Sequence, residues 1–418
     1  MSLDRMESRI KQDLEYLKRF TATPGKGCTR LPFTEEAKGA VDYLKEKMQE
    51  AGMETWEDEA GNVFGVLKGN SSQQPCVMMG SHYDSVTNGG DFDGIAGVVC
   101  AIEVARQIKE QKIELDRDFV VAGFCDEEGL RFGTGYFGSG AMLGHRDVEY
   151  CRKFKDMDGI SIYDAMNSYG LNPENIKKAK WNDQSIMAFL ELHIEQGPVL
   201  DTQQIEIGLV DCIVGIQRYM VTVHGRADHA GTTPMDMRID AVDAATKVIS
   251  KIGDWAREKG TGTVATTGYI CTKPGGMNIV AEEVQFTVDI RSRNNDNICQ
   301  IADSIREELE VQTQRIGGSF EIEQKLNITP VNLSQAMLDV MQSTCEEKKY
   351  TYKRMPSGAG HDSLEIGQTI PTVMIFVPSK DGRSHCPIEY TSYEEFAKAT
   401  DVMVELVKKL LTEEQTIV

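Results

Sequence analysis

The sequence lacks the features of several common protein classes. Its longest apolar run, residues 94–102, ends at Glu103 and is too short to cross a bilayer. The first residues include no apolar stretch of the kind that a secretory signal needs, so we expect no signal peptide. Positive charge is also scarce, because 45 Lys and Arg residues stand against 65 Asp and Glu residues, a net charge of -20. Such a charge repels phosphate backbones and anionic lipids, so we expect no nucleic acid and no membrane as a partner.

Cysteine-pairing signals and internal repeats are absent as well. The ten cysteines form no C-x-x-C pair and no disulfide-framework spacing, so we interpret them as reduced thiols in a cytoplasmic protein. No low-complexity tract interrupts the chain. Its 418 residues, 40% hydrophobic and 26% charged, have the length and composition of two or three compact globular domains.

The hydrophobic pattern predicts an α/β fold, a mostly parallel sheet flanked by helices. Outside the middle of the chain, strand-like apolar runs alternate with helical spacing, which is typical of such sheets. We expect helices over residues 1–20, 35–51, 95–109 and 335–349 and from Tyr393 onward, and strands over residues 76–81, 119–125 and 371–377.

The middle of the chain follows the order β-α-β-β-α-β, which is typical of a small ferredoxin-like α+β domain. The expected strands cover residues 217–224, 263–272, 283–290 and 319–325, and the expected helices cover residues 240–259 and 298–316. We therefore predict one larger domain made of residues 1–212 and 330–418, with a domain of residues 213–329 inserted into it.

Because the chain has only seven histidines, the surroundings of each are informative. His82 follows an apolar run and opens the sequence His-Tyr-Asp-Ser. At the carboxyl end of a parallel strand, where open α/β sheets place their ligand crevices, such a loop brings imidazole and carboxylate together. Asp84 is therefore a candidate to accept a hydrogen bond from the His82 ring nitrogen that does not face the ligand.

Three consecutive carboxylates, Asp126, Glu127 and Glu128, follow the next strand. Alone, such a run is usually a solvated turn, because clustered carboxylates repel one another unless a cation is near. Here His193 and His385 also follow apolar runs of the same domain. Histidine nitrogens and carboxylate oxygens bind divalent ions of the zinc, manganese or cobalt type, so the sequence favours a site for two such ions.

Five motifs, in order along the chain, resemble those of the hydantoinase/carbamoylase-type amidases, which belong to the wider superfamily of dinuclear zinc peptidases. That group includes N-carbamoyl-L-amino acid hydrolases, allantoate amidohydrolases and β-ureidopropionases. The motifs are GSHYDS at residues 80–85, NGG through FDG at residues 88–94, DEEG at residues 126–129, ELHIEQG at residues 191–197 and AGTTPM at residues 230–235.

The resemblance implies two divalent ions, with zinc expected first and manganese, cobalt or nickel as alternatives. The implied ligands are His82, Asp93 and His193 for one ion and Asp93, Glu128 and His385 for the other. Glu127 would be the general base. Because neighbouring side chains of an extended strand point to opposite faces, Glu127 and Glu128 can share one site only if the chain turns, which Gly129 permits.

The resemblance also assigns residues to substrate binding. His229 would stabilise the oxyanion, often in the site of the partner subunit, while Asn278 and Arg291 would bind the substrate, the arginine through a carboxylate. Gln196 and Gly360 are weaker candidates for the same role. A homodimer that pairs through the inserted domain is implied as well, with a hinge near residues 212 and 330 that lets this domain close as a lid.

The implied function is hydrolysis of the carbamoyl group of an N-carbamoyl-L-amino acid, a small-molecule ureido substrate. Allantoate amidohydrolase or β-ureidopropionase activity fits the same motifs. A metallo-aminopeptidase or dipeptidase is another alternative, although such peptidases usually carry a carboxylate where this chain has His193. A non-catalytic binding protein is a further one, but it would be expected to lose ligands or the base, and all of them are present.

One motif points to a different chemistry. Residues 133–138, GTGYFG, fit the dinucleotide fingerprint G-x-G-x-x-G. That fingerprint should follow a strand directly and open a helix. Here residues 126–132 intervene, and they bring carboxylates that would repel a pyrophosphate. We therefore expect no nicotinamide cofactor.

Overall fold

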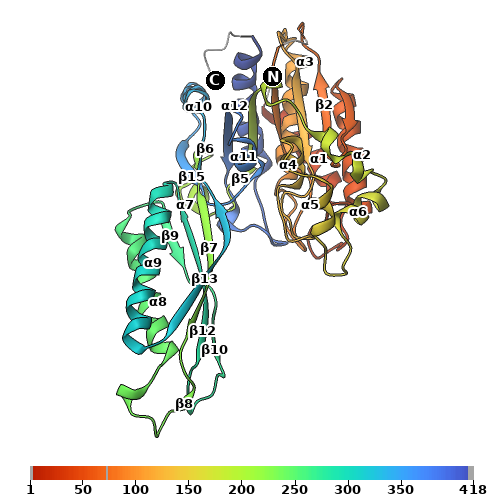
Figure 1. Ribbon diagram of the computed structural model, residues 1–418. Coiled ribbons are helices and arrows are strands. Elements are labelled where there is room, and N and C mark those ends of the chain that lie inside the picture. The colour runs from red at the N-terminus through yellow and green to blue at the C-terminus, as the bar shows by residue number, and fades with distance from the viewer. Residues whose placement is uncertain (1–2, 72–73, 413–418) are drawn as a thin grey trace. The chain divides into compact units, whose positions relative to one another are not determined.

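The computed structural model describes residues 3–71 and 74–412 and divides into two compact units (Figure 1). The first unit joins Met1–Asp211 with Asn332–Val418, and the second is Cys212–Val331. The second unit thus lies between two parts of the first in the sequence. Each unit has a hydrophobic core of its own.

The first unit is built on a nine-stranded sheet with a parallel centre. Its strands run in the order β1-β2-β4-β3-β5-β16-β6-β14, with β15 beside β6. The neighbours β4, β3, β5 and β16 are parallel, whereas β1 with β2, β2 with β4 and β6 with β16 pair antiparallel. The strands are β1 Glu54–Glu57, β2 Val63–Leu67, β3 Cys76–His82, β4 Phe119–Phe124, β5 Ile186–Ile194, β6 Ile207–Ile213, β14 Val331–Asn332, β15 Tyr352–Ser357 and β16 Thr372–Val377.

Side chains from the two faces of this sheet enter separate clusters, because successive residues of a strand point to opposite faces. In β3, Val77 and Met79 join the larger cluster, whereas Cys76 and Met78 join the smaller one. The larger cluster takes in helices α1, α2, α3, α10 and α12. These and the remaining helices are α1 Leu3–Leu17, α2 Glu35–Glu50, α3 Ile95–Glu110, α4 Phe137–Met142, α5 Val148–Lys153, α6 Ile162–Tyr169, α7 Val199–Gln203, α10 Gln335–Lys348, α11 Asp362–Ile366 and α12 Tyr393–Thr412.

The four parallel strands all end at the same edge of the sheet. In register, His82 at the end of β3 pairs with Phe124 of β4, and His193 of β5 pairs with Phe376 of β16. Loops that are far apart in the sequence therefore leave the sheet side by side. This edge is where open α/β sheets bind their ligands.

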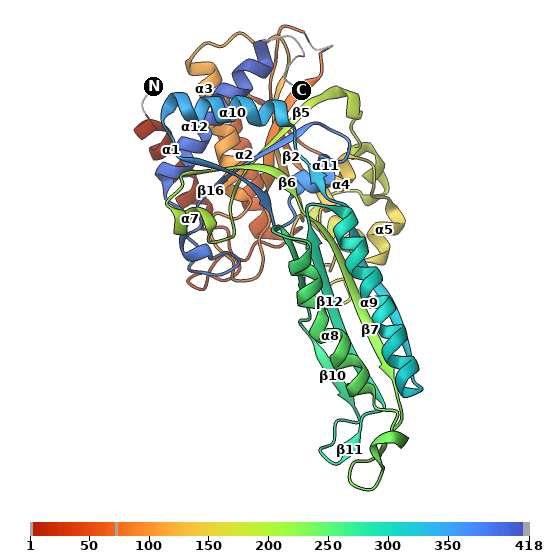
Figure 2. The ribbon, with the colours of Figure 1, turned by 90° about the vertical axis from the view of Figure 1, so that its left-hand side faces the viewer.

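The second unit is an antiparallel sheet covered on one face by two helices (Figure 2). The strand order is β10-β12-β7-β13, with β9 paired to β12, and β12 alternates strictly between buried and half-buried residues. A two-stranded sheet, β8 with β11, lies at one end of the unit. The elements are β7 Gly215–His224, β8 Asp228–His229, α8 Ala241–Glu258, β9 Thr263–Thr266, β10 Ile270–Lys273, β11 Ile279–Val280, β12 Glu283–Ser292, α9 Asn295–Ile316 and β13 Ser319–Ile328.

The predicted fold class is confirmed, and two of its details need correction. The single strand expected over residues 263–272 is wrong, because β9 and β10 are separate strands that pair with different stretches of β12. Apolar alternation alone did not reveal the break. The helix expected over residues 1–20 ends at Leu17, and its first two residues lie outside the described part of the chain.

The described helices and the cysteines bear on two expectations from the sequence. None of the helices in residues 3–71 and 74–412 combines the length and the hydropathy that a bilayer crossing requires. All ten cysteines are free, and most of them are buried.

Candidate metal centre

Two histidines are fixed with their Nε2 atoms toward each other. The Nδ1 of His82 lies 3.2 Å from the carbonyl oxygen of Asp84, and the Nδ1 of His193 lies 2.9 Å from the carbonyl oxygen of Ile194. In each neutral ring Nδ1 therefore carries the proton, and the two Nε2 atoms, 3.4 Å apart, keep their lone pairs. Both rings are almost fully buried.

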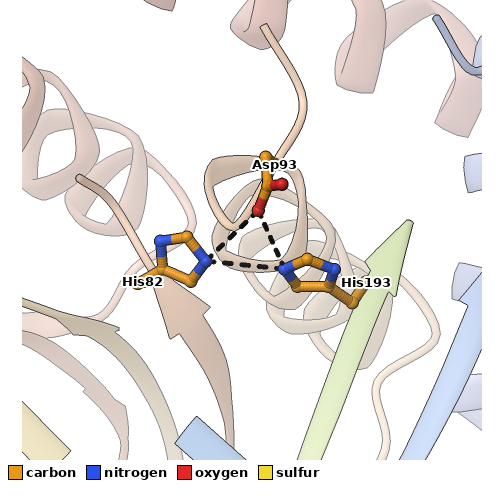
Figure 3. A group of neighbouring side chains, drawn as sticks. All are labelled: His82, Asp93 and His193. Carbon is orange, nitrogen blue, oxygen red and sulfur yellow. Dashed lines mark hydrogen bonds and ion pairs between the residues drawn. The ribbon is translucent and has the colours of Figure 1, made fainter. Parts of the chain in front are cut away.

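Asp93 completes this first group of ligands (Figure 3). Its Oδ1 lies 3.4 Å from His82 Nε2 and 3.2 Å from His193 Nε2, and it accepts no hydrogen bond from the described residues. The next residue, Gly94, has a φ of 65°, and a Cβ there would lie 2.3 Å from the His82 ring, so only glycine lets carboxylate and imidazole meet. Two nitrogen lone pairs and a buried carboxylate oxygen without a hydrogen bond form a set that fits a divalent cation of the zinc type.

The other oxygen of Asp93 faces a second group. Asp93 Oδ2 lies 3.3 Å from His385 Nε2, which in turn lies 3.3 Å from Glu128 Oε1. That Glu128 oxygen is buried and has no hydrogen-bond partner among the described residues. Because Asp93 directs one oxygen toward each group, it has the arrangement of a carboxylate that bridges two cations.

Glu127 and Glu128 share one side of the sheet edge because the chain turns around them. Asp126 has a φ of 58° and Gly129 a φ of 63°, both in the left-handed region. The sequence pointed to Gly129 alone as the turning residue. A non-glycine residue in this conformation is uncommon, and Asp is one of the few types that tolerate it.

The carboxylate of Asp84 holds this turn in place. It accepts the backbone N–H of Glu127 at 3.1 Å and that of Glu128 at 3.3 Å. It also lies 3.6 Å from His82 Nδ1, so one side chain contacts both the first histidine and the acidic turn. In this arrangement Glu127 Oε2 lies 3.9 Å from His82 Nε2.

The electrostatics of the site reflect a surplus of buried carboxylates. Burial raises the pKa of the Glu127 carboxyl well above its usual value, and the charges of Glu128 and Asp362 add to this effect. Burial would raise the pKa of Asp93 too, but the histidines around it, His193 first, hold that pKa well below its usual range. A divalent cation in this site would compensate the carboxylates and take the place of protons on the histidines.

Sequence reasoning missed a carboxylate that joins the two ligand loops. Glu389 Oε1 accepts the backbone N–H groups of Phe92 at 3.0 Å and Asp93 at 3.1 Å. Ser384 Oγ lies 2.9 Å from Glu389 Oε2 and 2.8 Å from Asp93 Oδ2. A Cβ on Gly90 would lie 2.0 Å from the Glu389 carboxylate, so glycine is required there. The only sequence signal was that Ser384 and Glu389 flank His385.

Two weaker candidates, Gln196 and Gly360, also lie in the first unit. Gln196 Nε2 donates to Asp93 Oδ2 at 2.7 Å, so in this structure its side chain contacts a ligand of the candidate centre. Gly360 precedes His361, whose buried ring packs edge-on against the ring of His193 with the centroids 4.5 Å apart. Burial lowers the pKa of His361 well below its usual value, so this ring is neutral.

The remaining candidates belong to the second unit and lie at its two ends. His229 is in β8 and pairs with Ile279 of β11, while the Ala230 N–H donates to the Asn278 carbonyl at 3.0 Å. Arg291 lies near the opposite end of β12. It is eight residues beyond Glu283, and at about 3.4 Å per residue the two lie about 27 Å apart. The structure therefore brings His229 and Asn278 together and keeps Arg291 apart from them.

Comparisons with known proteins agree with one another. The model of a family described as Peptidase family M20/M25/M40 matches residues 78–409. An N-carbamoyl-L-amino-acid amidohydrolase of Paenarthrobacter aurescens is 38% identical over 98% of this chain and 100% of its own length. An allantoate amidohydrolase of Bacillus subtilis is 34% identical over 97% of this chain and 98% of its own. A crystal structure is known for an amidase of the hydantoinase/carbamoylase family from Burkholderia multivorans. Its sequence is 31% identical to this chain, and the two structures match with a TM-score of 0.88 over 97% of this chain and 98% of the amidase chain.

The protonation of the histidines predicts how metal affinity depends on pH. The carboxylates of Asp93 and Glu128 raise the pKa of His385 to about 10. Burial would lower the pKa of His82, but the carboxylates of Asp84 and Asp93 outweigh burial and raise it. A ring must lose its proton to bind a metal, so below these pKa values we expect affinity for zinc to rise by up to about tenfold per pH unit for each proton released.

Competition with a chromogenic chelator between pH 6 and pH 8 measures this affinity, with the chelator's own pH dependence subtracted. Titration in unbuffered solution counts the protons released and serves as the control. An affinity that stays constant with pH, or binding without proton release, would contradict the assignment of these histidines as ligands.

The Glu389 contacts predict an effect on metal retention. Glu389→Ala removes the acceptor for two backbone N–H groups of the Asp93 loop, so we expect zinc affinity to fall about 10-fold to 100-fold. Glu389→Gln should stay close to the unmodified protein, because its amide oxygen still accepts those N–H groups and its amide nitrogen still bonds Ser384. Zinc content after dialysis against a chelator measures the effect. Glu394→Ala, which changes an exposed glutamate nearby, is the matched control. Equal retention in the alanine and control variants would remove Glu389 from the site.

Proposed function

The chain belongs to Peptidase family M20/M25/M40, and from this premise we propose that it is a metal-dependent amidohydrolase of N-carbamoyl-L-amino acids. The reaction would cleave the carbamoyl C–N bond and yield the amino acid, carbon dioxide and ammonia. One observation carries the proposal: two groups of histidine and carboxylate ligands share Asp93, with Glu127 beside them. The amidohydrolase relatives, which align over nearly the whole chain, support the type of bond cleaved.

The family and the buried ligand groups indicate a divalent metal site. We propose two ions, zinc first, with manganese, cobalt or nickel as alternatives, held by His82, Asp93 and His193 and by Asp93, Glu128 and His385. A pair of divalent ions, when bound, lowers the pKa of a bound water molecule to near neutrality and polarises a carbonyl group. Neither of these two ligand groups contains a soft sulfur ligand of the kind that would select other metals.

Glu127 has the role of general base in this proposal. It takes a proton from the attacking water and gives it to the departing nitrogen. Its burial supports both steps, because a carboxyl whose pKa is raised by burial is a competent proton acceptor and donor near neutral pH. Its backbone is held by Asp84, so the carboxylate stays beside the ligand groups while it exchanges the proton.

Substrate binding is proposed for residues of both units. Arg291, in the second unit, would bind the substrate carboxylate, since a guanidinium and a carboxylate can form two parallel hydrogen bonds. Gln196 and Gly360 of the first unit, and Asn278 and His229 of the second, would supply further contacts.

The proposed assembly is a homodimer that pairs through the second unit. The separation along β12 supports it: Arg291 and the pair His229 with Asn278 are too far apart in one subunit to contact one small substrate. If all three serve the same site, His229 and Asn278 act on the substrate of the partner subunit. A cytoplasmic location is part of the proposal, and the ten free cysteines support it.

Allantoate is the second candidate substrate. The Bacillus subtilis relative, 34% identical, is an allantoate amidohydrolase, and the same ligand groups would serve a second ureido compound. A peptidase is less well supported, because His193 stands where peptidases of the superfamily usually have a carboxylate. β-Ureidopropionate completes the set of ureido compounds to compare.

A panel of substrates tests the activity itself. Zinc-loaded protein is given N-carbamoyl-L-amino acids, allantoate, β-ureidopropionate and dipeptides, and ammonia or amine release is measured. We expect ammonia from the ureido compounds and no cleavage of the dipeptides. Glu127→Gln should keep its zinc and lose about 100-fold to 10,000-fold in turnover, because the amide cannot accept a proton. Turnover close to that of the unmodified protein would remove Glu127 from the role of base.

Hybrid dimers test whether His229 serves the partner's site. Subunits carrying Glu127→Gln and subunits carrying His229→Ala are given different affinity tags, co-expressed and purified as mixed dimers. If His229 acts across the dimer, one of the two sites in each hybrid has both an intact base and an intact histidine, and about half of the normal activity returns. If His229 acts within its own subunit, neither site is complete and the hybrid is as inactive as its parents.

A further inference from the structure

The G-x-G-x-x-G segment, residues 133–138, supports the acidic turn through its backbone. The N–H groups of Tyr136, Phe137 and Gly138 donate to the carbonyls of Glu127, Asp126 and Cys125 at 3.0, 3.0 and 2.8 Å. A Cβ on Gly135 would lie 2.4 Å from the Glu127 carbonyl oxygen, so the two stretches of chain touch only because glycine is present. The glycines of this motif therefore support the carboxylate turn.

Tyr136 is the one residue of this segment whose large side chain stands in an unusual backbone conformation. Its φ of 55° and ψ of 36° are left-handed, which is rare for a bulky residue. Besides its own N–H bond to Glu127, its carbonyl accepts from the Gly140 N–H at 2.9 Å and from Arg146 Nη2 at 3.0 Å. Several hydrogen bonds therefore hold the main chain of Tyr136 in this strained conformation, as is common for residues at functional sites.

The ring extends from the base toward Gly360. A Cβ built on Gly360 would lie 1.8 Å from the Tyr136 hydroxyl oxygen and 3.0 Å from the ring carbon that bears it. Burial raises the pKa of the Tyr136 phenol, so the hydroxyl stays protonated. Tyr136 therefore bonds the backbone of the proposed base with its N–H and places its hydroxyl against Gly360, a proposed substrate contact.

The Tyr136 hydroxyl is also free to bind. Within residues 3–71 and 74–412 it makes no hydrogen bond, and the side chain is only partly buried. A phenol O–H is a strong donor, and a donor that lines a binding site discriminates against ligands that leave it unpaired.

We propose that the Tyr136 hydroxyl donates a hydrogen bond to the bound substrate and selects ureido compounds that carry a further acceptor next to the ureido group. This inference rests on the proposed function and refines its substrate class. The acceptor is a carboxylate or a ureido group in addition to the α-carboxylate that all of these substrates share. N-carbamoyl-L-aspartate and allantoate are therefore favoured over N-carbamoyl-L-alanine, whose side chain offers no acceptor.

The experiment removes the hydroxyl and keeps the ring. For zinc-loaded Tyr136→Phe we expect kcat/KM to fall about tenfold or more on N-carbamoyl-L-aspartate and allantoate, and about twofold or less on N-carbamoyl-L-alanine. Zinc content and Tm should match those of the unmodified protein. Tyr16→Phe is the matched control, because it makes the same chemical change at an exposed site in α1.

Two results would overturn the assignment. Unchanged kcat/KM on every substrate would mean that the hydroxyl does not contact the substrate. An equal loss on all three substrates would mean that it supports the turn and selects nothing. Failure of the proposed function looks different, because the unmodified protein itself would then release no ammonia from any ureido compound, and the assignment would fall with it.

Discussion

Uncompensated negative charge at one edge of a parallel sheet is the constraint on which the rest of the first unit depends. Asp93, Glu127 and Glu128 are brought together with little access to water, where carboxylates repel one another strongly. The same carboxylates raise the pKa values of His82 and His385 above their usual range. A site of this kind is complete only with cations in it, which makes metal affinity a consequence of the fold itself.

Much of this edge could be predicted from the sequence because its ligands are marked by the residues next to them in the chain. His82 and His193 lie at or next to the ends of β3 and β5, and Glu128 comes shortly after β4. Parallel strands deliver their ends to one place. His82 and the acidic turn are cases in which a few neighbouring residues were enough. The turn at Asp126 was less accessible, since its left-handed conformation depends on hydrogen bonds from residues 136–138.

What the sequence could not reveal are contacts between residues far apart in the chain. The bond from the Asp93 N–H to Glu389 spans 296 residues and leaves no trace in periodicity or spacing. Tyr136 is a similar case, because only the folded chain shows its hydroxyl against Gly360. The break between β9 and β10 was missed for another reason: the apolar pattern continues through it, and only the pairing with β12 distinguishes the two strands.

The bond between Glu389 and the Asp93 loop also has a consequence for biosynthesis. His82 and Asp93 leave the ribosome early, but their partners His385 and Glu389 are made only after the second unit has been synthesised. A nascent chain therefore carries four of the five proposed ligands and lacks only His385 while the second unit is being made. The second ligand group is therefore complete only after residues 384–389 have been made and contact Asp93, so metal selection by both groups comes late in synthesis.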